Sequence, residues 1–336
     1  MSRVRKAVIT AAGRGTRQYP ASSAVQKEMF PLVDRDGLAK PIIQIIGEEA
    51  IDAGVEEICI VTQPGDESHY RSYFQRMNDE TLKAFKGKAW AIDAGERLHA
   101  FGERLTFVSQ DSPEGYGHAV YQAREFVGDE PFLLMLGDHI YIAGSGATGN
   151  CAAQLIEHHR HSGAKATSAV QATPASSLHL FGAIQGAPIE GHDHRDVEAD
   201  SAGLYHVKSI YEKPTAEYAA SHLRTPGLAH HSYLCHFGMH VFPGAIFDAL
   251  AHHIDNDIRE RGEIQLTSSQ EYMRTQLLKE NDYAACTIDG QRYDTGIPYG
   301  LMESQLALAM AGTHRGEIVE AIARLLASEL QSLSKK

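Results

Sequence analysis

Short apolar runs alternate with amphipathic stretches along most of this chain. The runs at 7–9, 55–62 and 131–136 have the length and composition of buried strands. A helical pattern begins at Pro41 and continues to about Ala53, between the first two of these runs. A strand, a loop, a helix and a second strand in this order predict a parallel α/β sheet.

The rest of the chain continues this alternation of strands and helices, except at residues 180–213. Residues 66–103 predict two helices, whereas residues 180–213 predict an antiparallel excursion with strands near 180–185 and 204–212, joined by the acidic link 191–201. The remaining expected strands lie at 105–109, 166–171, 232–242 and 283–288, and the remaining expected helices at 118–127, 152–161, 243–252, 263–278, 299–311 and 316–333. Together these elements predict an α/β fold with a Rossmann-like mixed, mostly parallel sheet flanked by helices, and with a small antiparallel subdomain.

The last expected helix carries an apolar stripe. Its residues recur at spacings of three and four, namely Ile318, Ile322, Leu326, Leu330 and Leu333. We expect this stripe to pack on the body of the protein, and the alternative is that it docks a second subunit. No repeat, low-complexity tract or convincing linker divides the sequence, so we expect residues 1–336 to form a single domain.

Composition and charge narrow the range of partners. The chain has 336 residues, of which 43% are hydrophobic and 22% charged, and its formal net charge is −12. An acidic protein is unsuited to a sequence-independent grip on nucleic acid or on an anionic membrane, so we expect neither as a partner. Any phosphate-binding site must therefore be a local cluster of basic residues.

The cysteines and the N-terminus indicate a reducing compartment. Cys59, Cys151, Cys235 and Cys286 are far apart and form no CxxC pair, which argues against a structural zinc site and a disulfide scaffold. The sequence contains no charged-then-apolar leader and no long apolar span. We therefore expect a cytoplasmic protein. The histidine clusters, such as 158–161, lack a partnering cysteine or an HExxH arrangement, and we interpret them as surface residues.

A glycine-bearing loop follows the first expected strand. Gly13 and Gly15 come directly after it, Arg17 follows them, and Lys27 lies ten residues further on. Glycines at a strand exit let the backbone approach a ligand closely, and an arginine and a lysine nearby suit a polyphosphate. The pattern indicates a nucleoside-triphosphate loop, although it is neither a Walker loop nor the dinucleotide fingerprint. Spacing alone leaves open a strand-to-loop turn with solvated Arg17 and Lys27.

Two aspartates are candidate metal ligands. Asp138 follows the apolar run 132–136, and ligands of open α/β sheets gather at the carboxyl ends of strands, where a carboxylate can hold Mg²⁺. Asp294, in the segment 293–296, could be a second acidic ligand that faces Asp138. The residues alone leave open a turn-capping role for Asp138, and a helix cap or an Asx turn at Asp294.

Two further motifs are ambiguous by themselves. Gln110 and the glycines Gly115 and Gly117 could surround a flat base, but on local grounds an ordinary glycine-rich turn is favoured. Glu212 and Lys213 precede a proline, and on local grounds they form an exposed ion pair of little energetic value.

Taken in order, these motifs resemble those of the sugar-1-phosphate nucleotidyltransferases. The opening pattern of that family, Gly-x-Gly-Thr-Arg followed by Pro and Lys, is present as Gly13–Arg17, Pro20 and Lys27. The continuation Lys27–Val33 looks most like that of the bacterial UTP–glucose-1-phosphate uridylyltransferases. The resemblance covers about 6–311 and is weak at 66–103 and 186–203.

The resemblance implies roles for individual residues. It implies catalytic roles for Arg17, Lys27 and Asp138, and metal ligation by Asp138 and Asp294. It implies nucleotide binding by Ala11, Ala12, Gly13, Gly15, Thr16, Glu28, Gln110, Gly115 and Gly117. It implies sugar-phosphate binding by Gly182, Glu212, Lys213 and Gly238. This chain departs from the family pattern at Gly137, His139 and Gly262, which leaves the sugar and base preference open.

The resemblance also implies a reaction, in which UTP and glucose 1-phosphate give UDP-glucose and pyrophosphate with Mg²⁺ as the cofactor. Residues 1–140 would then mainly bind the nucleotide, residues 141–312 would mainly bind the sugar phosphate through the antiparallel subdomain, and residues 313–336 would form a C-terminal helix. A homo-oligomer, either a dimer or a tetramer, is expected. The alternatives are a related enzyme that uses dTTP or another hexose 1-phosphate, and a non-catalytic sugar-nucleotide sensor.

Overall fold

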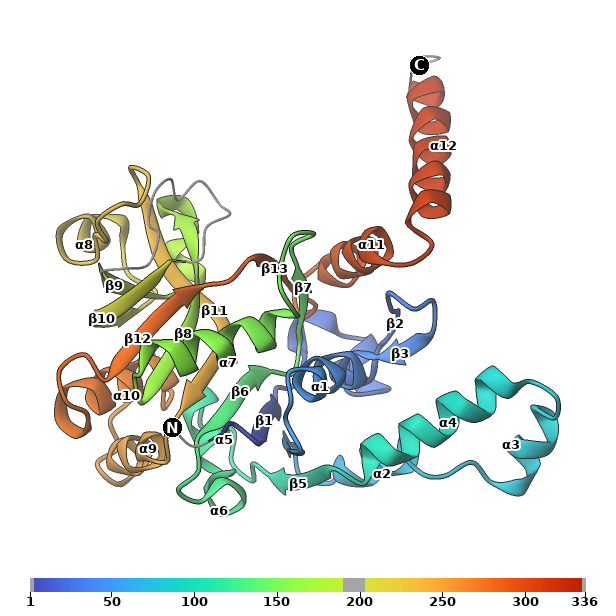
Figure 1. The fold of residues 1–336 in the computed structure, drawn as a ribbon, viewed down its shortest axis with the longest axis horizontal. Coiled ribbons are helices and arrows are strands. Elements are labelled where there is room, and N and C mark those ends of the chain that lie inside the picture. Colours follow the sequence, from blue (N-terminus) through green and yellow to red (C-terminus); the bar gives the residue numbers. More distant parts are fainter. Residues whose placement is uncertain (1–2, 190–202, 334–336) are drawn as a thin grey trace.

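The computed structural model describes residues 3–189 and 203–333, and it contains a nine-stranded central sheet (Figure 1). The order across this sheet is β5-β4-β1-β6-β11-β8-β12-β10-β9. β10 and β11 run opposite to the other strands, so the sheet is mixed and mostly parallel, as predicted. The predicted link 191–201 lies outside the described residues.

The strands of this sheet are β1 (Lys6–Ala11), β4 (Glu57–Thr62), β5 (Leu105–Ser109), β6 (Phe132–Leu136), β8 (Ala166–Pro174), β9 (Gly182–Pro188), β10 (Leu204–Glu212), β11 (Ser232–Phe242) and β12 (Tyr283–Thr287). Two smaller sheets pair β2 (Pro31–Val33) with β3 (Ala39–Pro41), and β7 (His139–Ala143) with β13 (Gly290–Asp294).

Helices cover both faces of the central sheet. The α-helices of the described residues are α1 (Ile42–Asp52), α2 (Glu67–Tyr73), α3 (Asp79–Ala84), α4 (Ala89–Gly102), α5 (Tyr116–Tyr121), α6 (Arg124–Val127), α7 (Cys151–Ser162), α8 (Ala216–His222), α9 (Ala245–Asp255), α10 (Leu266–Tyr272), α11 (Gly300–Ala311) and α12 (Arg315–Leu333).

The apolar strand runs explain why both faces are covered. Residues Phe132 to Met135 of β6 are fully buried, and successive side chains of a strand point to opposite faces of the sheet. On one face the strands pack against apolar residues of α1 and α7, and on the other against those of α5, α9 and α10. The carboxyl ends of β1, β5 and β6 therefore lie between two helical layers.

Some helix boundaries differ from the expected ones. Residues 66–103 form α2, α3 and α4 rather than two helices, because Asn78 caps α3 by accepting a hydrogen bond from the Thr81 N–H at 2.8 Å. The helix expected at 118–127 is divided into α5 and α6.

The helix expected from residue 263 begins at Leu266 instead. Ile264 pairs with the loop before α5, since its N–H donates to the Glu114 carbonyl at 2.8 Å and its carbonyl accepts from the Gly117 N–H at 2.9 Å. These backbone hydrogen bonds replace the first helical turn and join the segment before α10 to the segment before α5.

The sequence analysis missed β7 and β13. These short strands pair antiparallel outside the central sheet, with Asp294 opposite His139 in the register. Because Asp138 directly precedes β7, this pairing brings the end of β13 next to Asp138.

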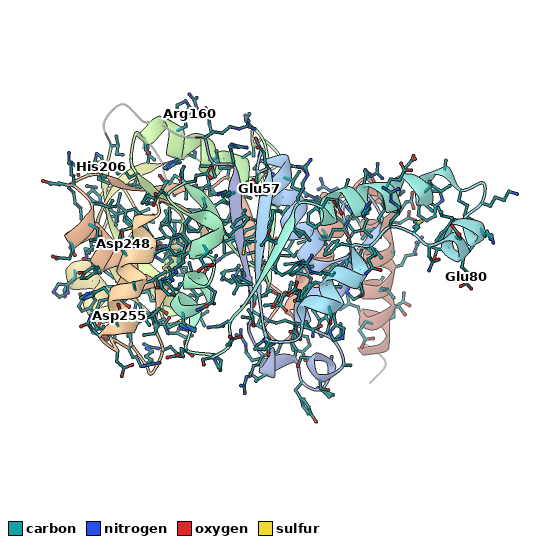
Figure 2. All side chains as sticks on the ribbon, turned by 90° about the horizontal axis from the view of Figure 1, so that it is seen from below. Glu57, Glu80, Arg160, His206, Asp248 and Asp255 are labelled. Atoms are coloured by element: carbon teal, nitrogen blue, oxygen red, sulfur yellow. The ribbon has the colours of Figure 1, made fainter. Side chains whose placement is uncertain are left out.

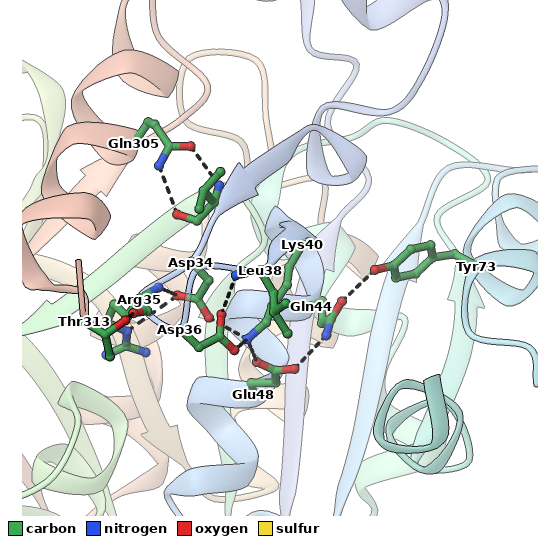
Figure 3. Close-up of polar contacts among 11 residues, drawn as sticks. Asp34, Arg35, Asp36, Leu38, Lys40, Gln44, Glu48, Tyr73, Gln305 and Thr313 are labelled. Atoms are coloured by element: carbon green, nitrogen blue, oxygen red, sulfur yellow. Dashed lines mark hydrogen bonds and ion pairs between the residues drawn. The ribbon is translucent and has the colours of Figure 1, made fainter. Parts of the chain in front are cut away.

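The hairpin β2–β3 follows the glycine loop, and its buried residue Lys40 is surrounded by three carboxylates (Figure 3). Lys40 Nζ contacts Asp34 Oδ2 at 2.7 Å and both Asp36 Oδ2 and Glu48 Oε2 at 2.8 Å. Burial alone would lower the pKa of Lys40, but the hydrogen bonds to these three carboxylates raise it above its ordinary value. The side chain of Gln305 on α11 bonds the backbone of β2, so the hairpin is tied to the C-terminal helices.

The stripe on α12 does not pack on the body of the protein, which corrects our expectation. α12 projects away from the sheet (Figure 1), and its residues Leu326 and Leu330 are 60% and 67% exposed. Ile318 and Ile322, near the start of the helix, are half-buried. The side chain of Leu333 lies outside the described residues.

Two histidines that we interpreted as surface residues are buried. His159 Nδ1 lies 3.0 Å from Thr167 Oγ1, and His253 Nδ1 lies 2.9 Å from the Ala249 carbonyl oxygen. Each is a core histidine with a hydrogen-bond partner, so the interpretation as a surface residue is wrong for these two.

The projection formed by α2, α3 and α4 lies at one end of the molecule. Figure 2 shows Glu80 of α3 at its tip, with Asp248 and Asp255 of α9 at the opposite end. Across residues 3–189 and 203–333, none of the helices combines the length and the apolar character needed to cross a membrane.

A buried carboxyl group between α1 and α7 should make stability depend on pH. Glu49 Oε1 accepts a hydrogen bond from the Ala152 N–H at 3.0 Å, and burial raises the pKa of Glu49 from 4.5 to about 7. The folded protein therefore holds this proton more tightly than the unfolded chain, and Glu49 lowers the free energy of unfolding by about 3 kcal/mol as pH rises through this range.

We expect Glu49→Gln, which keeps the acceptor oxygen, to abolish this loss. Urea unfolding at pH 5 and pH 8 should show that the variant gains about 2.5 kcal/mol relative to the wild type between the two conditions. The same difference between the two proteins at both pH values would contradict the assignment.

Candidate active site

A cleft of about 860 Å³ lies at the carboxyl ends of β1, β5 and β6. Gly13, Gln110 and Asp138, which follow these three strands in turn, all line it. Glu212 and Gly238, from the second half of the chain, line it as well. The cleft therefore occupies the sheet edge at which ligands of open α/β sheets gather.

Lys27 connects the glycine loop to Asp138. It begins a 3₁₀ turn, its side chain is 11% exposed, and its Nζ forms ion pairs with Asp138 Oδ2 and, at 3.3 Å, with Glu28 Oε1. Burial alone would lower the pKa of Lys27, but the two carboxylates raise it. The ammonium group is thus charged, buried and close to the backbone of Gly13, whose Cβ position would lie 3.5 Å from it.

Asp138 carries a stable negative charge. Its Oδ1 accepts a hydrogen bond from His139 Nδ1 at 2.9 Å, and its Oδ2 faces Lys27. Burial alone would raise the pKa of Asp138, but His139 and Lys27 hold it well below its usual range. Asp138 is therefore available as an ionised ligand at neutral pH.

Asp294 lies beside Asp138. One ligand atom from each of Asp138, His139 and Asp294 lies within 4.8 Å of the others. Asp294 Oδ1 accepts from the Gly296 N–H at 2.7 Å, which is an Asx turn, and the N-cap of α11 is Tyr299. Asp294 therefore does not cap that helix, and its turn uses one carboxylate oxygen only.

The Arg17 side chain lies close to Asp138 and Asp294. A Cβ atom at Gly296 would lie 3.0 Å from Asp138 Oδ2, 3.1 Å from Asp294 Oδ1 and 3.5 Å from Arg17 Nη2. A guanidinium group, an ammonium group and two carboxylates thus converge in one part of the cleft. In a chain of net charge −12, this is a local concentration of two cations.

Glu28 lies behind Lys27 rather than along the cleft. Its side chain is 1% exposed, and burial raises its pKa from 4.5 to about 7, despite the opposing effect of Lys27. Glu28 therefore forms its ion pair with Lys27 behind the cleft, and within the described residues neither of its carboxylate oxygens has a hydrogen-bond partner.

A second part of the cleft surrounds Glu212. Glu212 Oε2 accepts a hydrogen bond from Thr267 Oγ1 at 2.7 Å, and Glu212 Oε1 lies 3.2 Å from Lys213 Nζ. A Cβ atom at Gly182 would lie 3.2 Å from Glu212 Oε2, so a larger residue would crowd this carboxylate. Gly238 has a φ of +94°, in the left-handed region that favours glycine.

Most of the residues predicted from the sequence line the cleft. They are Ala12, Gly13, Arg17, Lys27, Gln110, Gly115, Asp138, Gly182, Glu212, Lys213, Gly238 and Asp294. The predicted residues that do not line it are Ala11, Gly15, Thr16, Glu28 and Gly117. A Cβ atom at Gly117 would lie 2.9 Å from the Ile264 carbonyl oxygen, so its small size serves the packing of α5 against the segment before α10.

The sequence analysis missed Arg292, His236 and Gln270, which also line the cleft. The Arg292 guanidinium lies over the Phe181 ring, 4.0 Å from its centroid, and burial lowers the pKa of Arg292. Its place two residues before Gly238 could have drawn attention to His236, although alternation alone does not fix its face, because the strand pairing is irregular between His236 and His240.

Comparison with known proteins decides the family. A family model described as nucleotidyl transferase matches residues 6–310. The chain belongs to the nucleotidyl transferase family. This nucleotidyl transferase is 34% identical over 316 residues to the UTP–glucose-1-phosphate uridylyltransferase of Bacillus subtilis, with 92% of each chain covered. It is 33% identical over 328 residues to UTP–glucose-1-phosphate uridylyltransferase 2 of Staphylococcus saprophyticus, with 97% of this chain and 99% of that one covered.

Solved structures agree with this relationship. UTP-bound UGPase from Acinetobacter baumannii has a TM-score of 0.73 and 28% identity, with 96% of this chain and 99% of that one covered. A UDP-glucose pyrophosphorylase complexed with UDP-glucose has a TM-score of 0.67 and 26% identity, with 90% of this chain and 98% of that one covered. The predicted fold class, the resemblance to uridylyltransferases and the assignment to the transferase class of enzymes are confirmed.

Proposed function

We propose that this nucleotidyl transferase converts UTP and glucose 1-phosphate to UDP-glucose and pyrophosphate. The observation that carries the proposal is the convergence of Arg17, Lys27 and Asp138 in one cleft, in a chain whose relatives are named for this activity. A phosphate oxygen of the sugar phosphate attacks the α-phosphorus of UTP in line, a new P–O bond forms, and pyrophosphate leaves. No covalent enzyme intermediate is needed.

Charge neutralisation is the main task of the site, because two anions must meet. Arg17 holds the β- and γ-phosphates that leave, with the bidentate geometry that a guanidinium group offers. Lys27 neutralises charge at the α-phosphate as the attacking oxygen approaches. Preorganised charges of this kind stabilise the transition state without reorganisation during the reaction.

The acidic residues of the site fit a divalent cation, and we propose Mg²⁺ held by Asp138 and Asp294. Two carboxylates and a histidine lie within 4.8 Å of one another, and Mg²⁺ in proteins takes one or two carboxylates together with phosphate oxygens. When bound, the ion supplies positive charge to both reacting phosphates. Lys27 pairs with Asp138 Oδ2 in the structure, so a polyphosphate that attracts the ammonium group frees this carboxylate for the ion.

The two halves of the chain divide the substrates between them. In our proposal residues 1–140 bind mainly the nucleotide, with Gln110 offering its amide to the pyrimidine edge. Residues 141–312 bind mainly the sugar phosphate, with Glu212 accepting hydrogen bonds from sugar hydroxyl groups and Lys213 contacting the phosphate. The remaining proposed contacts along the cleft are Ala12, Gly13 and Gly115 on the nucleotide side, and Gly182 and Gly238 on the sugar side. The other predicted nucleotide-side residues, namely Ala11, Gly15, Thr16, Glu28 and Gly117, do not line the cleft, and we propose that they support the loops that do.

A substrate panel tests the proposed function. Pyrophosphate release is measured with UTP, dTTP and other triphosphates, each paired with several hexose 1-phosphates. The proposal predicts the highest kcat/KM for UTP with glucose 1-phosphate, and loss of activity with EDTA that Mg²⁺ restores. A higher kcat/KM for dTTP or for another sugar would assign a related transferase, and no release with any pair would indicate a sugar-nucleotide sensor.

We propose a cytoplasmic location. Cys59, Cys151, Cys235 and Cys286 are all free and buried, which is the state of thiols in a reducing compartment. Fractionation of cells that produce the full chain tests this, and recovery outside the cytoplasm would contradict it.

We also propose that α12 joins copies of this chain into a homo-oligomer, either a dimer or a tetramer. The support is the exposed apolar face around Leu326 and Leu330 on a helix that projects from the body. A second copy presents the same face, so two copies of α12 can bury each other's leucines.

Exchanging both leucines for aspartate, in the variant Leu326→Asp/Leu330→Asp, is expected to give monomers. Light scattering measures the mass of the variant, of the wild type and of a control, Leu82→Asp, which changes an exposed leucine on α3. The proposal is supported if the wild type and the control have an oligomeric mass and the double variant has the mass of a monomer. Equal masses for all three proteins would refute it.

A further inference from the structure

The cleft contains buried polar atoms that the proposed reaction does not use. His236 on β11 is 8% exposed, and within the described residues neither of its ring nitrogens makes a hydrogen bond of good geometry, although the Gln270 side chain lies close enough to act on the pKa of His236. Oε1 of Gln270 on α10 is also buried without a partner there, while its Nε2 lies 3.3 Å from His240 Nδ1. An unpaired buried polar group costs about 1–3 kcal/mol, so such atoms along a cleft indicate a ligand that pairs with them.

The hydrogen-bonding capacity of these atoms suits a hydroxyl group of a ligand better than an anionic group. Burial, and to a lesser extent the charge of Arg292, lowers the pKa of His236 from 6.5 to about 4, so its imidazole is neutral. A neutral imidazole offers one donor and one acceptor, and the amide oxygen of Gln270 is an acceptor only. A phosphate oxygen without a proton cannot donate to these acceptors, whereas a hydroxyl group can both donate and accept.

The position of His236 connects it to the sugar side of the cleft. A Cβ atom at Gly182 would lie 2.8 Å from His236 Cδ2, 3.0 Å from Thr267 Oγ1 and 3.2 Å from Glu212 Oε2. Gly238, two residues further along β11, also lines the cleft, and a Cβ atom there would lie 3.0 Å from Leu136 Cδ1 and 3.1 Å from Tyr141 Oη. His236 therefore borders the region where a hexose ring would lie beside Glu212.

We propose that His236, together with Gln270, binds a ring hydroxyl group of the hexose 1-phosphate and thereby helps to select the sugar. This inference rests on the proposed function, because it assumes that the sugar phosphate occupies this side of the cleft. His236 touches the substrate but takes no part in the transfer of the nucleotidyl group.

Deoxy analogues of glucose 1-phosphate test the proposal without a variant. The 2-, 3-, 4- and 6-deoxy compounds are compared with glucose 1-phosphate in kcat/KM at saturating UTP. At least one analogue, which lacks the hydroxyl group paired with His236, is expected to lose about tenfold. Equal kcat/KM values for all four analogues and for glucose 1-phosphate would overturn the proposal.

The variant His236→Phe then identifies the partner of that hydroxyl group. This change keeps a flat ring and removes both nitrogens, so KM for glucose 1-phosphate should rise about tenfold while KM for UTP stays within about twofold. The variant should also no longer discriminate against the affected analogue. The matched control is His159→Phe, the same change at a buried histidine that does not line the cleft.

The outcomes separate this inference from the proposed function. If the wild type turns over UTP and glucose 1-phosphate but His236→Phe still discriminates against the same analogue, the inference fails and the proposed function stands. If no substrate pair reacts, the proposed function fails, and calorimetric binding of glucose 1-phosphate to the wild type and to His236→Phe tests the inference. Equal affinities for the two proteins would then overturn it, and weaker binding by the variant would support it.

Discussion

The substitution Lys27→Ala is expected to lower turnover by roughly two to four powers of ten. The ammonium group of Lys27 is buried, charged and paired with Asp138, so no solvent cation can readily take its place when the side chain is removed. Two anionic substrates would then meet with less positive charge between them, and the transition state would lose more stabilisation than the bound substrates do. Pyrophosphate release at saturating UTP and glucose 1-phosphate measures this loss.

A matched control separates this effect from general damage. Lys6 Nζ pairs with Glu130 Oε1 at 2.6 Å at the start of β1, the opposite end of the strand from the cleft. Lys6→Ala removes a lysine of similar burial and should leave turnover within about twofold of the wild type. Wild-type turnover in a folded Lys27→Ala protein would show that the proposed role of Lys27 is wrong.

The substitution Asp294→Asn should separate the two roles of Asp294. Asparagine keeps an oxygen that can accept the hydrogen bond from the Gly296 N–H, so the Asx turn is preserved, but the negative charge is lost. If Asp294 is a metal ligand, we expect turnover to fall roughly a hundredfold or more and the Mg²⁺ requirement to rise.

Titration of Mg²⁺ against turnover, with thermal unfolding as a check on folding, measures this effect. A variant with wild-type turnover and wild-type Mg²⁺ dependence would assign Asp294 to the turn alone. Asp138→Asn serves as the reference for complete loss of a metal ligand, because the partners of Asp138 hold it ionised in the same cluster.

Much of the fold could be predicted from local patterns in the sequence. The buried strands β1, β4 and β6 were predictable because apolar runs of strand length are typical of the buried strands of an α/β sheet. β7 and β13 were not, since they pair only with each other and the residues of β13 form no apolar run. The stripe on α12 indicated an apolar face correctly, but a stripe does not specify what covers it.

The site residues that could be predicted are likewise those whose neighbours in the sequence identify them. Arg17 and Lys27 belong to one continuous motif, and Asp138 follows a strand, so each could be selected from its neighbours in the sequence. His236, Gln270 and Arg292 lie on three separate elements that meet only in the folded chain. The sequence likewise left open whether Asp294 forms a helix cap or an Asx turn, and only the folded geometry distinguishes them.

A crystal structure of the protein with UTP, Mg²⁺ and a hexose 1-phosphate tests the central claim most directly. The account predicts that both phosphate esters lie in the single cleft, with the triphosphate in contact with Arg17 and Lys27, and the ion on Asp138. A triphosphate bound elsewhere, or bound in the cleft without contact to either cationic side chain, would contradict it.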